Sequence, residues 1–271
     1  MTKLLSYLFA FASLIALHPA PVAAGGSIDD LVQIEVLDGG LTKRGTYQAA
    51  LHLTLSQGWK TYWRAPGDSG IPPQFDWRGS RNVADVAITW PTPHVFNQDG
   101  LRSIGYKNHL VLPIEITPAK SGRPVRLSGE MEFGLCKDVC IPGRLDFDHQ
   151  LNADAPRNPS IAAALAQRPY SASEAGVRSS TCHLSPTSDG MRIEAHITMP
   201  SAGGPEVAVI EPGNPQLWAS QTKTTRRGNT LIATSDLSHV SGAAFALNRS
   251  LVRITVLGQR HAVDITGCTP G

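Results

Sequence analysis

Apolar and polar residues alternate along much of this chain, in short runs separated by glycine and proline. Residues 31–37 (LVQIEVL) alternate in this way before Asp38-Gly39-Gly40, and residues 47–55 (YQAALHLTL) alternate before Gln57-Gly58. A period of two places every second side chain on the same face of a strand, which indicates strands with one buried face. The pattern therefore predicts an all-β chain built from antiparallel β-sandwiches.

Further strands are predicted from the same pattern in both halves of the chain. Before residue 152 they cover residues 86–90, 110–116, 125–133 and 145–151. After residue 178 they cover residues 191–197, 207–210, 230–234, 243–247, 251–257 and 261–265. Two β-sandwich domains are therefore expected, over residues 25–152 and 179–271, and no convincing sequence repeat relates them.

Between these domains the sequence becomes rich in alanine, proline and serine, over residues 153–178. Asn158-Pro159 is a helix start signal, and it predicts one short helix over residues 160–167. We interpret residues 153–178 as a linker.

The first 24 residues have the layout of a cleavable secretory signal peptide. Lys3 precedes an apolar run over residues 4–17, and Val22-Ala23-Ala24 supplies the small residues of a cleavage site before Gly25. An uncleaved membrane anchor is the alternative, but the run is short for a membrane span. We expect export into a compartment where disulfides persist, without stable membrane insertion.

Charge and motif content exclude several classes of function. With 24 Lys and Arg against 22 Asp and Glu, the formal net charge is +2, and the basic residues are scattered. No nucleic-acid groove and no patch for anionic membranes is indicated. No Ser/His/Asp arrangement, phosphate-cradling glycine loop or carboxylate pair stands out to indicate a hydrolase or a nucleotide enzyme.

The four cysteines form two pairs of very different spacing. Cys182 and Cys268 bracket the second domain, and in an oxidising compartment two such cysteines are expected to join to each other. Closing a loop of about 85 residues would stabilise the fold by about 4 kcal/mol on the chain-entropy estimate. We interpret this pair as a structural disulfide.

Cys136 and Cys140 stand four positions apart in the stretch FGLCKDVCIPG. Four extended residues span about 13 Å, whereas a disulfide needs its α-carbons about 4.4–6.8 Å apart, so residues 137–139 must turn back. A ring this small is a weak staple, and strained or exposed disulfides are the ones that exchange. Lys137 would favour a thiolate at the first cysteine, and Asp138 would oppose it.

The spacing alone leaves three interpretations of this pair open: redox exchange, a local structural bridge and a metal site. Zinc has the least support, because no nearby cysteine or histidine motif completes four ligands. Copper bound through thioethers would find Met131 alone close by, and a site built from distant residues would need His94, His109 or His149. Neither a metal nor a cofactor is predicted.

Several spaced blocks of the first domain resemble one protein family. They are GWKTYWRAPGDSGIPPQFDW at residues 58–77, Asn82-Val83, Trp90-Pro91, Gly105-Tyr106, LVLPIEI at residues 110–116 and CKDVCIP at residues 136–142. In this order they are similar to the amino-terminal periplasmic region of DsbD-like disulfide reductases, most closely the ScsB branch, named for suppression of copper sensitivity. The resemblance covers residues 34–151, whereas the second domain agrees only in length and placement.

This resemblance implies an immunoglobulin-like sandwich with a reversible cysteine pair, located in the periplasm. Carried over by position, Cys136 and Cys140 are the catalytic redox pair, and Cys140 is expected to enter mixed disulfides. The implied partners are periplasmic thioredoxin-like or disulfide-isomerase-like proteins. Because this sequence stops at Gly271 without the family's membrane conduit and thioredoxin-like domain, a separate inner-membrane electron donor is expected. A non-catalytic interaction or metal-stress module with a structural disulfide is the alternative.

The family also covers its cysteine pair with a loop that opens when a partner docks. By position this cap loop is residues 96–103, with Phe96 or Leu101 as the apolar cover, Gly100 as a hinge and Asp99 as its one acidic residue. An ordinary polar turn is the alternative interpretation.

One stretch of the first domain is rich in aromatic residues, namely Trp59, Tyr62, Trp63, Phe75 and Trp77. Aromatic side chains can form a binding platform, but core packing under a long loop is the commoner arrangement and is our interpretation. Arg64 and Asp68 are predicted to pair across the turn that interrupts this stretch.

Overall fold

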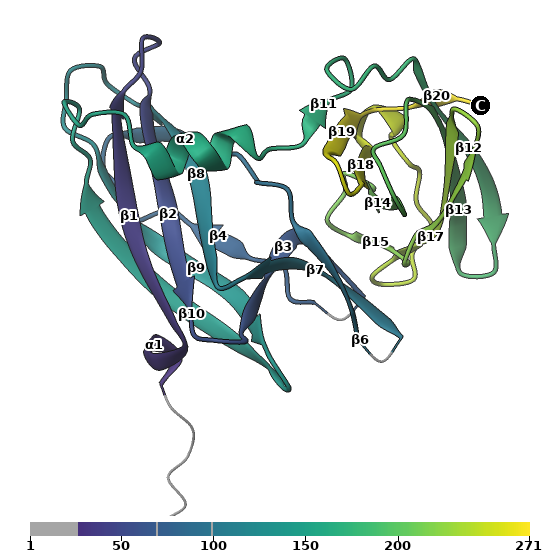
Figure 1. Cartoon of the computed structure of the whole chain (residues 1–271), viewed down its shortest axis with the longest axis horizontal. Helices are drawn as coiled ribbons and strands as arrows, with labels where there is room; N and C mark the ends of the chain where they lie inside the picture. The colour runs from purple at the N-terminus through teal and green to yellow at the C-terminus, as the bar shows by residue number, and fades with distance from the viewer. Residues whose placement is uncertain (1–26, 69, 99) are drawn as a thin grey trace, which may run out of the picture.

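The computed structural model describes residues 27–68, 70–98 and 100–271. These residues form two β-sandwiches that lie next to each other, the first over residues 32–150 and the second over residues 170–270 (Figure 1). Within the described ranges, each sandwich combines a four-stranded sheet with a six-stranded sheet. The all-β fold class with antiparallel sandwiches is confirmed, and the signal peptide expected over residues 1–24 lies outside the described residues.

The first sandwich contains the strands that hold the close cysteine pair. Its four-stranded sheet has the order β1 (Val32–Leu41), β2 (Tyr47–Leu55), β8 (His109–Pro118), β5 (Val83–Ile88). Its six-stranded sheet has the order β10 (Cys140–Gln150), β9 (Arg126–Cys136), β3 (Lys60–Gly67), β7 (Leu101–Lys107), β6 (His94–Gln98), and β4 (Gln74–Asp76) pairs with β9 as well. Strand β10 is therefore an edge strand, which suits Pro142, a residue without an amide donor.

The second sandwich repeats this division into sheets of two sizes. Its four-stranded sheet has the order β11 (Tyr170–Ser171), β19 (Ala262–Thr266), β18 (Arg253–Leu257), β14 (Val207–Glu211). Its six-stranded sheet has the order β15 (Leu217–Ala219), β17 (Thr230–His239), β13 (Gly190–Thr198), β12 (Ser179–Thr187), β20 (Thr269–Pro270), and β16 (Lys223–Arg227) pairs with β17. Buried and partly exposed residues alternate along β17, as its sequence pattern predicts.

Helical structure in the described residues is confined to short segments. Helix α1 covers Ile28–Leu31, the 3-10 helix η1 covers Arg249–Leu251, and α2 covers Pro159–Ala166. The Asn158 side chain caps α2 by accepting hydrogen bonds from the amides of Ser160 and Ile161, as the helix start signal predicts. Helix α2 lies across β8 (Figure 1). In the part of the chain that the structure describes, no helix has the length and apolar content needed to cross a membrane.

One predicted strand is absent and one observed strand, β3, was not predicted, each for an identifiable reason. Residues 243–247, predicted as a strand, are irregular, although Phe245 and Leu247 pack against the second core. The alternation in this segment reflects the partial burial of every second side chain, but no strand of the described residues pairs with its backbone. Strand β3 has no alternating pattern, because its first four residues are all buried. A strand covered on both faces loses the period of two.

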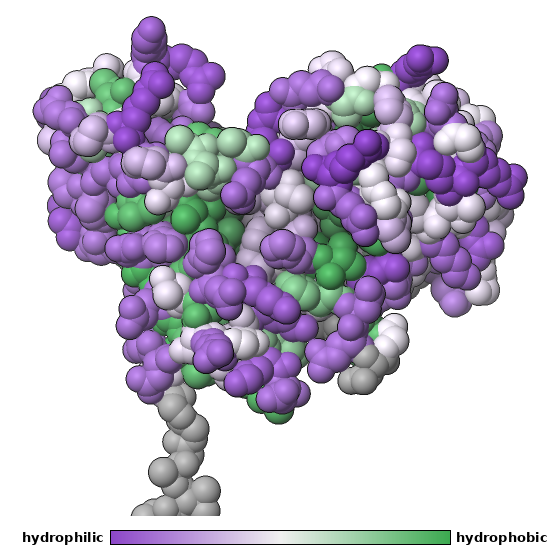
Figure 2. Space-filling model, in the orientation of Figure 1, coloured by the Kyte–Doolittle hydropathy of each residue, from purple (hydrophilic) through white to green (hydrophobic). Residues whose placement is uncertain are grey.

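Arg64 of β3 joins the two sandwiches. Its guanidinium forms an ion pair with Glu211 of β14, at 3.0 Å, and donates to Thr255 Oγ1 of β18 at 3.2 Å. Leu257 and Ala262 of the second sandwich are buried in the core cluster of the first. In Figure 2 the two lobes touch, and the visible face is mostly hydrophilic with smaller hydrophobic areas on the first sandwich.

The pairing predicted between Arg64 and Asp68 is therefore wrong. The acidic partner of Arg64 comes from a residue 147 positions away in the sequence, across the contact between the sandwiches. Proximity in sequence favoured Asp68, but the direction of the β3 side chains decides the pairing.

Gly105 of β7 is expected to be intolerant of a side chain. A Cβ at this position would overlap the carbonyl oxygen of Thr61 and lie 2.9 Å from the Cα of Tyr62. Gly105→Ala should therefore push β7 away from β3 and lower the free energy of unfolding by about 2 kcal/mol or more. Chemical denaturation measures this change.

Gly122→Ala provides the matched control for this experiment. Gly122 has a φ of +70°, and no heavy atom lies within 4 Å of its added Cβ. Its substitution should cost about 1 kcal/mol from backbone strain alone. Equal losses in the two variants would show that β7 does not approach β3 as closely as described.

Candidate redox site

Cys136 and Cys140 face each other at the end of the β9–β10 hairpin. Cys136 is the last residue of β9, Cys140 is the first residue of β10, and the two are directly opposite in the ladder. Their sulfurs are joined in a disulfide, with the α-carbons 4.1 Å apart. The turn expected over residues 137–139 is present, and it is tightened by a hydrogen bond from the Lys137 amide to the Val139 carbonyl, at 3.1 Å.

The two cysteines differ sharply in exposure. Cys136 is 6% exposed, whereas Cys140 belongs to an exposed stretch that begins at Lys137. Val139, the residue before Cys140, is 64% exposed. The greater exposure of Cys140 favours attack by an incoming thiolate at this residue over attack at Cys136.

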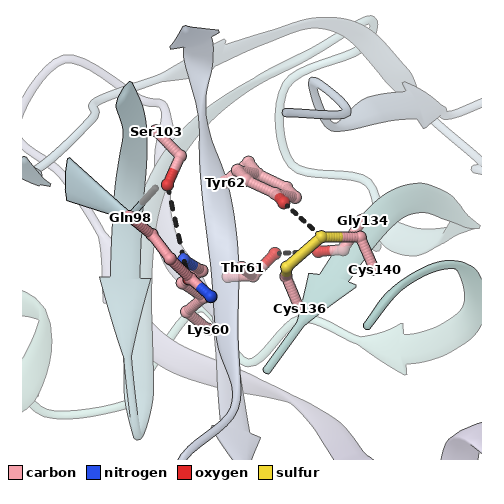
Figure 3. The surroundings of a disulfide bond; sticks show 8 residues. All are labelled: Lys60, Thr61, Tyr62, Gln98, Ser103, Gly134, Cys136 and Cys140. Carbon is pink, nitrogen blue, oxygen red and sulfur yellow. Dashed lines mark hydrogen bonds between the residues drawn. A yellow bond between two sulfur atoms is a disulfide. The ribbon is translucent and has the colours of Figure 1, made fainter. Parts of the chain in front are cut away.

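Tyr62 of β3 places its hydroxyl against the disulfide. The hydroxyl oxygen lies 3.2 Å from Cys140 Sγ (Figure 3). Because a disulfide sulfur has no hydrogen, the hydroxyl is the donor. The side chain is 2% exposed, and this burial raises the pKa of Tyr62. The hydroxyl therefore keeps its proton, and its capacity to donate, at neutral pH.

Two glycines make room for the Tyr62 ring. A Cβ on Gly134 of β9 would lie 2.7 Å from two ring carbons, and a Cβ on Gly70 would lie 2.8 Å from a third. The backbone nearby is held by Thr61, whose buried hydroxyl donates to the Gly134 carbonyl at 3.0 Å. The ring orientation, and with it the position of the hydroxyl, is therefore fixed by packing.

Lys60 lies on the other side of β3 from the disulfide in Figure 3. It is paired with Cys136 in the β3–β9 ladder and is 8% exposed. Its ammonium lies 3.4 Å from Ser103 Oγ, 3.5 Å from Gln98 Oε1 and 5.1 Å from the centre of the Phe96 ring. Burial lowers the pKa of Lys60, and the nearby Lys107 lowers it further.

The sequence did not single out Lys60 or Tyr62 as site residues. Both lie in WKTYW, a stretch whose aromatic residues indicate core packing. A usable signal was present, since a lysine two positions from a tyrosine in a strand shares its face. The sequence could not predict the pairing of β3 with β9, which brings this face of β3 next to Cys136.

Residues 96–103, predicted to be a cap loop, form a β-hairpin made of β6 and β7. Phe96 is partly buried, and its ring is contacted by the ammonium groups of Lys60 and Lys107, at 5.1 and 5.0 Å. Leu101 is 54% exposed and Gly100 has a φ of +80° with open space around it. Asp99 lies outside the described residues. Strand β3 separates this hairpin from β9 and β10 in the sheet, and the capping role stays a prediction.

The second cysteine pair has a different setting. Cys182 of β12 and Cys268 are joined in a disulfide that closes 86 positions of sequence. Cys182 is fully buried and Cys268 packs against the same core cluster. The full burial of Cys182 and the partial burial of Cys268 limit access to these sulfurs, which supports the structural interpretation.

The histidines considered as distant metal ligands lie apart from the cysteines. His149 Nε2 pairs with Asp38 Oδ2 at 2.7 Å. His94 and His109 line a cavity of about 330 Å³ that also borders α2. Across the described ranges, no three His, Cys, Asp or Glu side chains converge as metal ligands.

The aromatic stretch packs as a core element. Trp63 and Tyr62 are buried, and Trp59, Phe75 and Trp77 are partly buried against the first core cluster. The Phe75 and Trp77 rings stack with centroids 5.4 Å apart. The interpretation as core packing is confirmed, with Tyr62 serving both the core and the disulfide.

Comparisons with known proteins concern the first sandwich and the fold of the chain. Residues 35–152 match the family described as the N-terminal region of the thiol:disulfide interchange protein DsbD. The crystal structure of the N-terminal periplasmic domain of ScsB from Proteus mirabilis superposes with a TM-score of 0.69 at 21% identity, covering 91% of this chain and 97% of that chain. At this identity the likeness establishes the shared fold. No curated protein matches the sequence.

Tyr62→Phe tests the hydrogen bond to Cys140. The variant keeps the ring and removes the donor, so the Cys140 thiolate of the reduced protein loses one hydrogen bond. We expect the pH of half-maximal alkylation at Cys140 to rise by about one unit, because a hydrogen bond to a charged group contributes about 1.5 kcal/mol or more. Site-resolved mass spectrometry across a pH series measures it.

Tyr106→Phe is the control, since the Tyr106 hydroxyl is buried but donates to the Pro91 carbonyl, at 2.8 Å. This variant should leave the Cys140 profile unchanged. Superimposable profiles for Tyr62→Phe and the unmodified protein would show that the hydroxyl does not act on the sulfur.

Proposed function

Residues 35–152 are a DsbD-like N-terminal region, and from this premise we propose that the chain is a thiol–disulfide exchange protein whose Cys136–Cys140 pair relays reducing equivalents to oxidised partner proteins. The observation that supports this most is the asymmetry of the pair. An exposed Cys140 is bonded to a buried Cys136 in a tight turn at a sheet edge. One sulfur can be attacked, and the other can leave without reaching solvent.

The exchange needs two displacement steps. A thiolate of the electron donor attacks Cys140 Sγ, the bond between the two sulfurs breaks, and Cys136 leaves as a thiolate with the electron pair. The donor's second thiolate then attacks the donor sulfur that is bonded to Cys140 and releases the Cys140 thiolate. The donor ends as a disulfide and the hairpin as a dithiol, so two electrons have moved.

The reverse sequence delivers the electrons to an acceptor. The Cys140 thiolate attacks the acceptor's disulfide, and the Cys136 thiolate then attacks Cys140 Sγ and releases the reduced acceptor. Tyr62 donates to the Cys140 sulfur, and the same hydrogen bond would stabilise Cys140 whenever it carries negative charge. No cofactor takes part in either step.

We propose the periplasm as the compartment, because the similar ScsB domain is described as periplasmic and disulfides persist there. The acceptors proposed are thioredoxin-like or disulfide-isomerase-like proteins, which present exposed disulfides. The electron donor proposed is an inner-membrane protein. The hairpin β6–β7, with Phe96, Gly100 and Leu101, is proposed as the element that moves when a partner docks.

Single-cysteine variants test the exchange. Cys136→Ala leaves Cys140 as a lone exposed thiol, which should capture an oxidised thioredoxin-like protein as a covalent complex that Cys136 can no longer resolve. Cys140→Ala should capture at least about tenfold less in the same time, because its remaining thiol is buried and thiol exchange depends on access. Non-reducing electrophoresis and mass spectrometry of the linked peptides measure both yields.

The variant Cys182→Ala/Cys268→Ala is the control, with both cysteines of the hairpin intact, and it should exchange without accumulating a complex. Absence of a complex with Cys136→Ala would contradict the proposed function and favour a structural disulfide. Equal capture by the two single-cysteine variants would contradict the role given to Cys140.

A further inference from the structure

Lys60 has a buried ammonium group whose described polar contacts are all to neutral oxygens. Its side chain is 8% exposed, and its ammonium contacts two neutral oxygens, Ser103 Oγ and Gln98 Oε1, at 3.4 and 3.5 Å. Among the residues that the structure describes, no carboxylate is paired with this ammonium. Burying an ammonium without an anion is costly, which makes a buried lysine opposite a reactive cysteine a candidate functional residue.

The ladder places Lys60 directly opposite Cys136, whose sulfur is displaced in the exchange. Lys60 is paired with Cys136 of β9 on one side and with Lys107 of β7 on the other. Directly opposite residues on antiparallel strands extend their side chains from the same face, with Cβ atoms about 4.5–5.5 Å apart. In the disulfide form the ammonium points away from Cys136, towards Ser103. The four methylene groups of the lysine side chain are long enough to bring the ammonium to a directly opposite residue when the side chain rotates.

The other charged and titratable groups near this face do not replace Lys60. They are Tyr62 on β3, Lys107 on β7, His94 on β6, Cys140 on β10, and Lys137 and Asp138 in the turn. Lys107, His94, Lys137 and Asp138 are exposed, and solvent weakens the effect of their charges. Lys137 also lies against Gly58, where an added Cβ would be 3.0 Å from its Cε.

We propose that Lys60 is a positioning residue for thiol exchange, whose ammonium pairs with the Cys136 thiolate once the disulfide has opened. This inference rests on the proposed function. When Cys136 leaves Cys140 with the electron pair, the cation is on the residue directly opposite and reaches the sulfur by side-chain rotation, so no proton has to be delivered to the buried sulfur. In the disulfide form the ammonium rests against Ser103, Gln98 and the Phe96 ring.

The sign of the effect follows from the charge. A cation beside Cys136 favours the thiolate and therefore the reduced form, which raises the reduction potential of the pair. Removing the cation should make the disulfide harder to reduce and should raise the pH at which Cys136 ionises. A role limited to packing would change neither quantity in this direction.

Three variants separate charge from packing, each prepared in the full chain. Lys60→Met keeps the length of the side chain and removes the charge, Lys60→Arg keeps the charge, and Lys137→Met removes an exposed charge adjacent in sequence to Cys136. Two quantities are measured for each: the equilibrium constant for reduction by glutathione, and the pH of half-maximal alkylation at Cys136 in the reduced protein.

For Lys60→Met we expect the equilibrium constant to fall by a factor of about three to ten, where tenfold corresponds to about 30 mV for a two-electron couple. The half-maximal pH at Cys136 should rise by about one unit. Lys60→Arg and Lys137→Met should both remain within about twofold of the unmodified protein, because the first retains the buried cation and the second loses only a solvent-screened one. Thermal unfolding confirms that each variant is folded.

The unmodified protein supplies a measurement that needs no substitution. Its Cys136 should reach half-maximal alkylation below about pH 8.5, the value of an ordinary thiol. A value at or above it would overturn the proposal, and so would an unchanged constant in Lys60→Met or equal losses in Lys60→Met and Lys137→Met. Failure of the unmodified disulfide to exchange with glutathione at all would instead contradict the proposed function.

Discussion

The antiparallel pairing of β3 with β9 at Lys60 and Thr61 determines the geometry of the whole site. Through it, Cys136 is buried against a neighbouring strand and Cys140 is left at the edge. The same strand brings Tyr62 to the Cys140 sulfur and Lys60 to the Cys136 position. Gly105 and Gly134 allow this approach because a side chain at either would collide with β3. The chemistry of the pair is thus a consequence of how closely three strands can pack.

The two disulfides of the chain differ in their contribution to stability and in their exposure. The Cys182–Cys268 bridge closes 86 positions and would contribute about 4–5 kcal/mol on the chain-entropy estimate, whereas closing four positions would contribute about 2 kcal/mol. The long closure lies within a core, and the short one has an exposed sulfur at a sheet edge. The Cys182–Cys268 disulfide therefore contributes more to stability, and the Cys136–Cys140 disulfide is more accessible to an incoming thiol.

Sequence patterns predicted most of the framework and part of the site. Strands with one buried face, such as β2 and β17, follow from alternation, and α2 follows from its capping residue Asn158. Strand β3 could not be predicted in this way, since residues buried on both faces show no period of two. Residues 243–247 show the converse error, because alternation records burial and not pairing.

The cysteines were found from their spacing, but their environment was not. Exposure of Cys140, the hydroxyl of Tyr62 and the ammonium of Lys60 all depend on ladder register between strands distant in sequence. Arg64 shows the same limit, since its partner Glu211 belongs to the other sandwich. Local sequence specifies which groups are available, and the sheet decides which of them meet.

The reduction potential of the Cys136–Cys140 bond in the unmodified protein tests the central claim most directly. Equilibration in thiol buffers of known potential, followed by mass spectrometry of alkylated peptides, reports the two disulfides separately. We expect Cys136–Cys140 to equilibrate above about −300 mV while Cys182–Cys268 remains oxidised. Reduction of Cys136–Cys140 only below about −300 mV, together with Cys182–Cys268, would contradict it.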